Sequence, residues 1–258
     1  MIDIVNAKKV FKEYVSNYDI TDGKIALKVA HILRVAELSK QIANSLDLSE
    51  EDVELAELIG LLHDIGRFEQ VRKFNTFNDK KSINHGEYGV KILFEDNLIE
   101  KFNIDEKYYK TIKIAILNHN RNCIENGLTE KELIHSKIIR DSDKLDIFHV
   151  LITDTMENIY GCSDEQMQNS SFSEITIKEF KEDHLIDYKN RKTFGDLWIS
   201  HVAYIFDFNF KNSYIIMKQN DYLNKLLERI NFKDSKTIEQ AKEIVEIGNE
   251  YMNMILNN

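Results

Sequence analysis

The chain contains no proline among its 258 residues and only nine glycines. Proline and glycine are the residues that most often end or interrupt a helix, so few points in this sequence force a helix to stop. Apolar residues recur with the three- and four-residue spacing of amphipathic helices, as in Ile25, Val29, Ile32 and Ala36. The sequence therefore predicts an all-α fold whose helices are joined by polar turns.

The composition excludes several classes of protein. Hydrophobic residues make up 43% and charged residues 30% of the chain, which is typical of a globular protein and not of a disordered or fibrous one. The formal net charge of −10 disfavours binding to nucleic-acid polymers and to anionic membranes. Charges interrupt the first 15 residues, so no signal-peptide core is expected, and two cysteines cannot form a disulfide framework. We expect a cytoplasmic protein.

Local signals divide the chain into helices and connections. Ser49 with the acidic residues after it, and Thr129 with Glu132, are typical of helix starts. Residues 67–84 look irregular and residues 162–175 read as a polar loop, while residues 173–178 fit either a short strand or a helix. The expected helices cover residues 25–46, 49–62, 84–93, 105–118, 129–161 with a kink, 173–186, 193–217, 219–231 and 235–256.

The polar stretch divides the chain into two parts. We expect residues 1–161 to form the main helical domain and residues 162–258 to form a helical extension packed on the same fold. Aromatic residues are dense around Trp198, and we expect them to pack the helices of this extension together.

Ionisable residues recur on, or at the end of, the apolar helices. His63 and Asp64 follow the apolar run of residues 58–62, where an unsatisfied ionisable pair is costly. His31 lies within an apolar helix. Each of these residues alone is more simply explained by a structural partner. Similar placements recur at His85, His119 and Asp143. Several such placements in one chain favour a shared metal site.

The residue types indicate which metals suit such a site. A mixed His/Asp set without cysteine suits Mn, Fe, Ni, Co or Zn, and carboxylates also accept Mg. One aspartate can bridge two ions, and paired ions activate water for a phosphoryl displacement. We expect one or two divalent ions.

The order of His31, His63-Asp64 and Asp143 resembles that of the HD-domain metal-dependent phosphohydrolases. The sequence His63-Asp64-Ile65-Gly66 matches the HDIG form of this family, and residues 85–89 and 142–146 also resemble family segments. The resemblance covers roughly residues 25–150. It implies an HD-domain-like helical bundle, here with a C-terminal helical extension.

The resemblance also implies roles for single residues. It implies four core metal ligands, two further ligands that hold a second ion or contact the substrate phosphate, and Asp64 as the bridge. Arg67 and Lys144 adjoin ligands and would act in catalysis by contacting phosphate. The implied ligands are His31, His63, Asp64, Asp143, and then His85 and His119.

Other residues near the motifs have two interpretations. Asp146 either orients a ligand histidine or lies on the helix surface, and Glu69 is a candidate general acid or base. The sequence departs from the family in two ways. The Gly-Tyr-Pro signature of the cyclic-di-GMP-degrading branch is absent, and Asn120 replaces the second histidine of a paired His-His.

By this resemblance, we expect an enzyme that hydrolyses a phosphate ester. The expected partner is a small phosphorylated substrate, in the first place a nucleotide, and not a nucleic-acid polymer or a membrane. The oligomeric state is left open. Two alternatives also remain open: an HD-type di-iron oxygenase, and a non-catalytic nucleotide-binding module. The bound metal and any dependence on oxygen distinguish them.

Overall fold

The computed structural model describes residues 2–258, and their regular structure is entirely helical, which confirms the predicted all-α class. The chain divides into two compact units, one ending at Asp146 and the other running from Ile147 to Asn258. The division falls within helix α7 (Glu130–Thr153), whereas the sequence suggested the polar stretch at 162–175. Because that stretch itself contains helix α9 (Asp164–Gln168), it does not act as a simple linker.

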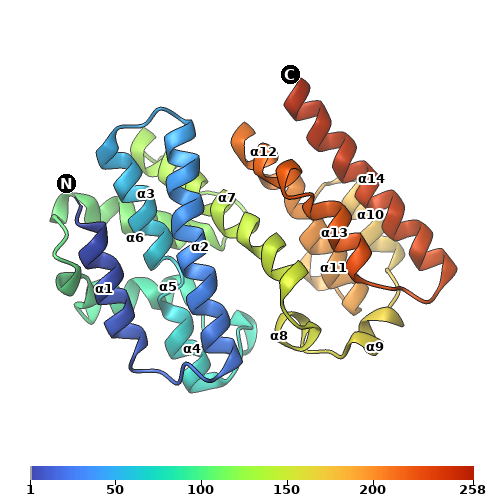
Figure 1. Cartoon of the computed structure of the whole chain (residues 1–258), viewed down its shortest axis with the longest axis horizontal. Coiled ribbons are helices and arrows are strands. Elements are labelled where there is room, and N and C mark those ends of the chain that lie inside the picture. Colours follow the sequence, from blue (N-terminus) through green and yellow to red (C-terminus); the bar gives the residue numbers. More distant parts are fainter. Residues whose placement is uncertain (1) are drawn as a thin grey trace. The chain divides into compact units, whose positions relative to one another are not determined.

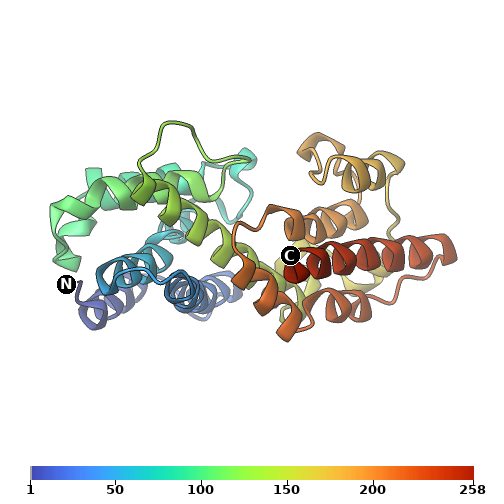
Figure 2. The same cartoon turned by 90° about the horizontal axis from the view of Figure 1, so that it is seen from above.

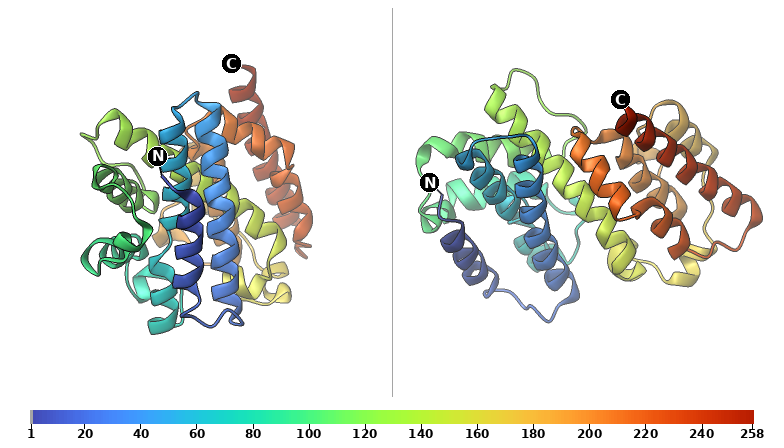
Figure 3. Two further views of the ribbon diagram at one scale, coloured as in Figure 1. Left: turned by 60° about the vertical axis from the view of Figure 1, so that its left-hand side comes forward. Right: turned by 45° about the horizontal axis from the view of Figure 1, so that its top comes forward.

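Three long helices form one side of the N-terminal unit. Helices α1 (Ile4–Val15), α2 (Gly23–Ser45) and α3 (Glu50–Leu62) lie side by side (Figures 1 and 3). Ser49 caps the start of helix α3, because its hydroxyl accepts from the Asp52 amide, and the acidic residues of the first turn suit the helix dipole. Helix α1 was not among the expected helices.

The other side of this unit is built from shorter helices (Figure 2). Residues 67–84 were expected to be irregular, but residues 67–74 belong to helix α4, which buries Phe68 and Val71 and carries the ion pair between Arg72 and Glu69. The elements are α4 (Gly66–Phe74), η1 (Asp79–Lys81), α5 (His85–Val90), η2 (Lys91–Glu95), η3 (Leu98–Phe102), η4 (Glu106–Tyr108) and α6 (Tyr109–His119).

Two glycines let backbones approach closely in this unit. A Cβ atom on Gly60 would lie 2.7 Å from the Cα of Ala36, so α2 and α3 can touch only because residue 60 has no side chain. A Cβ atom on Gly66 would lie 2.4 Å from the carbonyl oxygen of His85, at the contact between α4 and α5. Gly60 stands three residues before His63, and Gly66 approaches His85 itself, so both contacts lie close to histidines.

The C-terminal unit gathers around a long final helix. Its elements after α7 are α8 (Met156–Tyr160), α9, α10 (Glu174–Glu182), η5 (Tyr188–Asn190), α11 (Phe194–Val202), η6 (Ala203–Asp207), α12 (Lys211–Gln219), α13 (Tyr222–Arg229) and α14 (Ser235–Asn257). Helix α14 packs against α11, α12 and α13 (Figure 3). Fully buried Trp198 stacks on Phe172 and meets Phe232 edge-on, which confirms the predicted aromatic packing.

The structure decides between the two interpretations of residues 173–178 in favour of the predicted helix, and it corrects one other predicted helix. A strand at 173–178 is excluded because α10 occupies the segment and buries Thr176 and Phe180 one turn apart. The helix expected over 193–217 is interrupted after η6, where Phe208 adopts an extended conformation. Phe208 packs there against Phe148 and Tyr214, so tertiary contacts override the helical periodicity.

Candidate metal centre

All six predicted metal-binding residues belong to the N-terminal unit, where five of them come together in two groups of possible ligands, and Asp143 lies beside the first group. Asp64 belongs to both groups. The side chains come from α2, from the turn after α3, from the start of α5, from the end of α6 and from α7. The histidines and Asp64 are at most 5% exposed, and the Asp143 side chain is 18% exposed.

The first group faces one oxygen of Asp64. The Nε2 atoms of His31 and His63 each lie 3.6 Å from Asp64 Oδ2. Asp143 Oδ1 lies 3.1 Å from His31 Nε2 and 3.7 Å from His63 Nε2. Two imidazole nitrogens and two carboxylate oxygens therefore surround one position.

The second group faces the other oxygen of Asp64. Its Oδ1 atom lies 3.3 Å from His85 Nε2 and 3.8 Å from His119 Nε2. The two Nε2 atoms lie only 2.9 Å apart. The two oxygens of one carboxylate thus point at two different sets of histidine nitrogens.

Backbone carbonyls orient one histidine in each group. His63 Nδ1 lies 2.8 Å from the Gly60 carbonyl oxygen, and His119 Nδ1 lies 2.6 Å from that of Ile116. A carbonyl oxygen only accepts, so each Nδ1 donates its proton. In the neutral ring, this leaves the Nε2 lone pair directed at Asp64.

Carboxylates orient the other two histidines. Asp146 Oδ2 lies 2.6 Å from His31 Nδ1, and Asp79 Oδ2 lies 2.6 Å from His85 Nδ1. Asp146 is therefore buried against His31 and does not lie on the helix surface, and its carboxylate also pairs with Arg34 at 2.5 Å. A carboxylate behind a histidine is a common arrangement around bound metals.

Unsatisfied atoms and charges in the cluster fit a divalent cation. Among residues 2–258, the buried atoms His31 Nε2, His63 Nε2 and Asp64 Oδ1 make no hydrogen bond, a costly state that a cation relieves. Burial lowers the pKa of His85 to about 3, so its ring is neutral. Burial alone would raise the pKa of Asp64, but nearby Lys28 and other charges hold it well below its usual range. Neutral imidazoles and carboxylates are ligands for first-row transition metals.

Basic side chains surround Asp64. Lys28 Nζ lies 2.7 Å from Asp64 Oδ2, a contact that was not predicted although Lys28 stands one helical turn before His31. Arg67 Nε lies 3.5 Å from Asp64 Oδ1, but its Nη1 donates to Phe77 O and Asp79 Oδ1. Arg67 thus also holds the segment that follows α4.

The remaining predicted residues lie as follows. Lys144 is buried in α7 next to Asp143, and the proposed phosphate contacts of Lys144 and Arg67 stay predictions. Glu69 accepts a 2.6 Å hydrogen bond from Tyr18 and pairs with Arg72, so its carboxylate is used outside the cluster.

The HD-domain family model matches residues 29–147 of the chain. Residues 29–147 form an HD domain. The match contains all six predicted ligands, and HD domains bind divalent metals and are commonly metal-dependent hydrolases. No curated protein and no solved structure matches the chain significantly. The assignment to the HDIG form stays a prediction.

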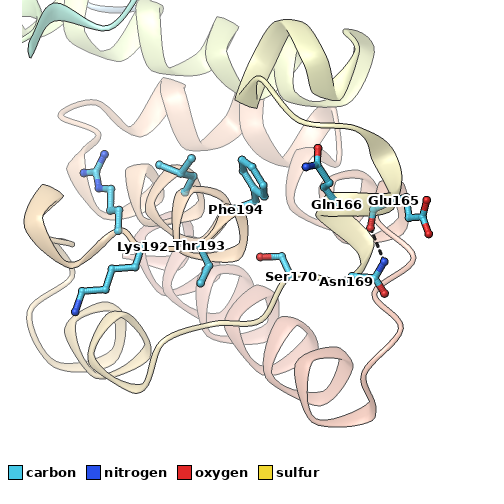
Figure 4. Close-up of a pocket in the computed structure, with 9 residues that line it drawn as sticks. Glu165, Gln166, Asn169, Ser170, Lys192, Thr193 and Phe194 are labelled. Carbon is cyan, nitrogen blue, oxygen red and sulfur yellow. Dashed lines mark hydrogen bonds between the residues drawn. The ribbon is translucent and has the colours of Figure 1, made fainter. Parts of the chain in front are cut away.

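Two surface hollows lie outside the histidine cluster. One, of about 530 Å³, lies in the C-terminal unit between α9 and the start of α11, where Ser170, Thr193 and Phe194 line it (Figure 4). The other, of about 910 Å³, is lined by residues of α1, α2 and α3 of the HD-containing unit, among them Lys8 and Glu57. Neither hollow is lined by a cluster histidine. Within residues 2–258, no helix combines the length and hydropathy of a membrane span.

Proposed function

We propose that this HD domain is a phosphohydrolase that uses two divalent ions to cleave a phosphate ester of a small molecule, in the first place a nucleotide. The observation that carries the proposal is the position of Asp64, whose two oxygens face two separate groups of histidine nitrogens. A shared carboxylate of this kind is typical of a two-ion centre.

Each ion would have its own ligands. His31, His63 and Asp143 would hold the first ion, and His85 and His119 the second, with Asp64 shared. When bound, a pair of divalent ions lowers the pKa of water and neutralises the charge that develops on phosphoryl oxygens.

The protein's own residues prepare this centre. The acceptors at Nδ1 keep the four Nε2 lone pairs directed inward, and the low pKa of Asp64 keeps its carboxylate ionised. Lys28 lies against Asp64 and is the cation that an anionic phosphate ester would meet beside the first position. Burial of the cluster strengthens all these electrostatic interactions.

The proposal is tested by metal analysis and turnover. Protein purified without chelators is expected to retain a first-row metal and to hydrolyse p-nitrophenyl phosphate or members of a nucleotide panel. His63→Asn and Asp64→Asn are each expected to lower kcat/KM by about 1,000-fold or more, because the ions supply several kcal/mol of transition-state stabilisation. His184→Asn is the matched control, since His184 is exposed and has a positive φ that asparagine tolerates.

Three results would contradict the proposal. The first is turnover that persists at the wild-type rate in either site variant. The second is an iron-bound protein whose only reaction consumes oxygen, which would assign the centre to an oxygenase. The third is tight nucleotide binding without turnover under every metal tried, which would assign it to a binding module.

A further inference from the structure

The segment between α4 and α5 places one carboxylate behind the second cation position. Asp79 begins the short helix η1, and its side chain is 28% exposed. Its Oδ2 atom lies 2.6 Å from His85 Nδ1, on the side of the imidazole ring away from Asp64. Asp79 was not among the site residues predicted from the sequence.

The other oxygen of Asp79 is held by donors from α4. Arg67 Nη1 and Gln70 Nε2 each donate to Asp79 Oδ1 over 2.9 Å. Gln70 is fully buried and also donates to the Ile83 carbonyl oxygen, which ties the segment to α4. The orientation of the Asp79 carboxylate is therefore fixed from both sides.

Asn120 strengthens the same arrangement from α6. Its side-chain amide donates to Asn84 Oδ1 over 2.9 Å and lies 3.4 Å from Asp79 Oδ2. Asn120 directly follows His119, where a second histidine would stand in a paired His-His. In this chain the position braces the segment that carries Asp79 instead of adding an imidazole.

We propose that Asp79 is the positioning residue of the second cation position: it fixes the Nδ1–H tautomer of His85 and so keeps His85 Nε2 free to bind the ion. The inference rests on the proposed two-ion function. A carboxylate that accepts from Nδ1 leaves the Nε2 lone pair available and raises the basicity of the ring.

The isosteric variant Asp79→Asn tests this mechanism because the new amide has one favourable orientation. Arg67 and Gln70 both donate to Oδ1, so the amide oxygen stays on their side and the NH₂ group faces His85 Nδ1. Nδ1 must then accept, and the ring proton moves to Nε2, where it blocks a metal bond. The volume changes little, and apart from the His85 contact only the long 3.4 Å contact from the Asn120 amide to Oδ2 is lost, so the variant alters the tautomer more than the packing.

Asp146 gives a matched comparison at the first position. It accepts from His31 Nδ1 as Asp79 accepts from His85 Nδ1, at the same 2.6 Å. Asp146→Asn is expected to weaken the first position and Asp79→Asn the second. Asp96→Asn is the charge-matched control, because Asp96 is exposed and its carboxylate pairs with Lys91 on the protein surface.

The experiment uses the full chain and two readouts. Calorimetric titration with Mn(II) or Co(II) is expected to give two sites in the wild type and in Asp96→Asn. In Asp79→Asn one site is expected to keep its affinity while the other weakens about 10- to 100-fold, the usual effect of removing such a partner. Proton–nitrogen NMR of the metal-free histidine rings is expected to show the His85 proton on Nδ1 in the wild type and on Nε2 in Asp79→Asn.

The outcomes separate this inference from the proposed function. Two wild-type-like sites in Asp79→Asn, or an unchanged His85 tautomer, would overturn the role of Asp79 and leave the proposed function standing. Loss of both sites together with a lower Tm would also overturn it, because Asp79 would then serve folding. A wild-type protein that binds no ion contradicts the proposed function itself.

Discussion

Each cluster histidine uses its two ring nitrogens for different tasks: Nδ1 meets a protein acceptor and Nε2 faces Asp64. For His63 and His119 the acceptor is the carbonyl three residues earlier, which a histidine at the end of a helix can reach without any distant partner. For His31 the acceptor is a carboxylate 115 residues away, and for His85 it is a carboxylate at the start of the short helix η1. The local pair could be inferred from position in a helix, and the remote pair required the fold.

The carboxylate of Asp196 in the C-terminal unit is expected to stabilise the folded protein. Its buried carboxylate accepts from two atoms of Ser173, from Thr176 Oγ1, and from the amides of Lys192 and Thr193. Asp196→Asn places an NH₂ group among donors and is expected to lower the free energy of unfolding by about 2–3 kcal/mol. Urea unfolding followed by the fluorescence of Trp198, the only tryptophan, measures it.

The effect of Asp196→Asn on the free energy of unfolding is also expected to depend on pH. Burial alone would raise the pKa of Asp196, but hydrogen bonds from Ser173 and Thr176 outweigh it and lower the pKa. A carboxyl with a lower pKa in the folded state stabilises the protein fully above its unfolded value of about 3.9 and loses this contribution as the pH falls through the folded value. The difference in the free energy of unfolding between wild type and Asp196→Asn is therefore expected to decrease below about pH 4. A difference in the free energy of unfolding that stays constant from pH 7 to pH 2.5 would contradict this account.

At the scale of elements, the cluster depends on how closely helix backbones approach. His31 stands in α2 and His63 follows α3, and these helices touch at Ala36 and Gly60. Spacing along the sequence predicts that each histidine lies near an apolar face, but it does not predict which two helices meet. A glycine inside an apolar helix is a signal for such a contact.

Gly60→Ala tests this dependence. A helical Gly-to-Ala change usually stabilises a helix, but here the new Cβ would lie 2.7 Å from Ala36 Cα and 2.9 Å from Ser39 Oγ. We expect the free energy of unfolding to fall by about 1–3 kcal/mol, measured by urea unfolding with far-UV circular dichroism, and we expect weaker metal binding.

Gly248→Ala in α14 is the matched control, because its Cβ would meet only side-chain atoms, the nearest being Leu223 Cδ1. It is expected to leave metal binding unchanged. A Gly60→Ala protein as stable as the wild type would show that the packing of α2 on α3 does not depend on the close contact between Gly60 and Ala36.

The two wrong predictions about helix boundaries, at α4 and after η6, have a common cause. The helix α4 was missed because residues 67–84 are rich in charge, although ion pairs from Glu69 and buried Phe68 stabilise it. The break after η6 was missed because the apolar residues there keep a helical spacing while Phe208 packs in an extended conformation. Periodicity reports which residues are buried, and tertiary contacts decide whether the backbone between them stays helical.

At the scale of the whole molecule, the predicted ligands span residues 31–143 and nevertheless meet in one unit. The convergence of these six residues could be predicted because their order resembles a known family and their types suit one class of cation, while their role as ligands stays a prediction. Lys28 and Asp79 were not predicted. Lys28 carried a weak signal, since it shares a helix face with His31, while Asp79 lies in a connecting segment whose path no periodicity describes.

The most direct test of the two-ion centre is a crystal structure of the protein incubated with Mn(II), with diffraction recorded near the manganese absorption edge. We predict two anomalous peaks, one beside Asp64 Oδ2 among His31, His63 and Asp143, and one beside Asp64 Oδ1 between His85 and His119. Anomalous peaks elsewhere, or none within bonding distance of Asp64, would contradict the account.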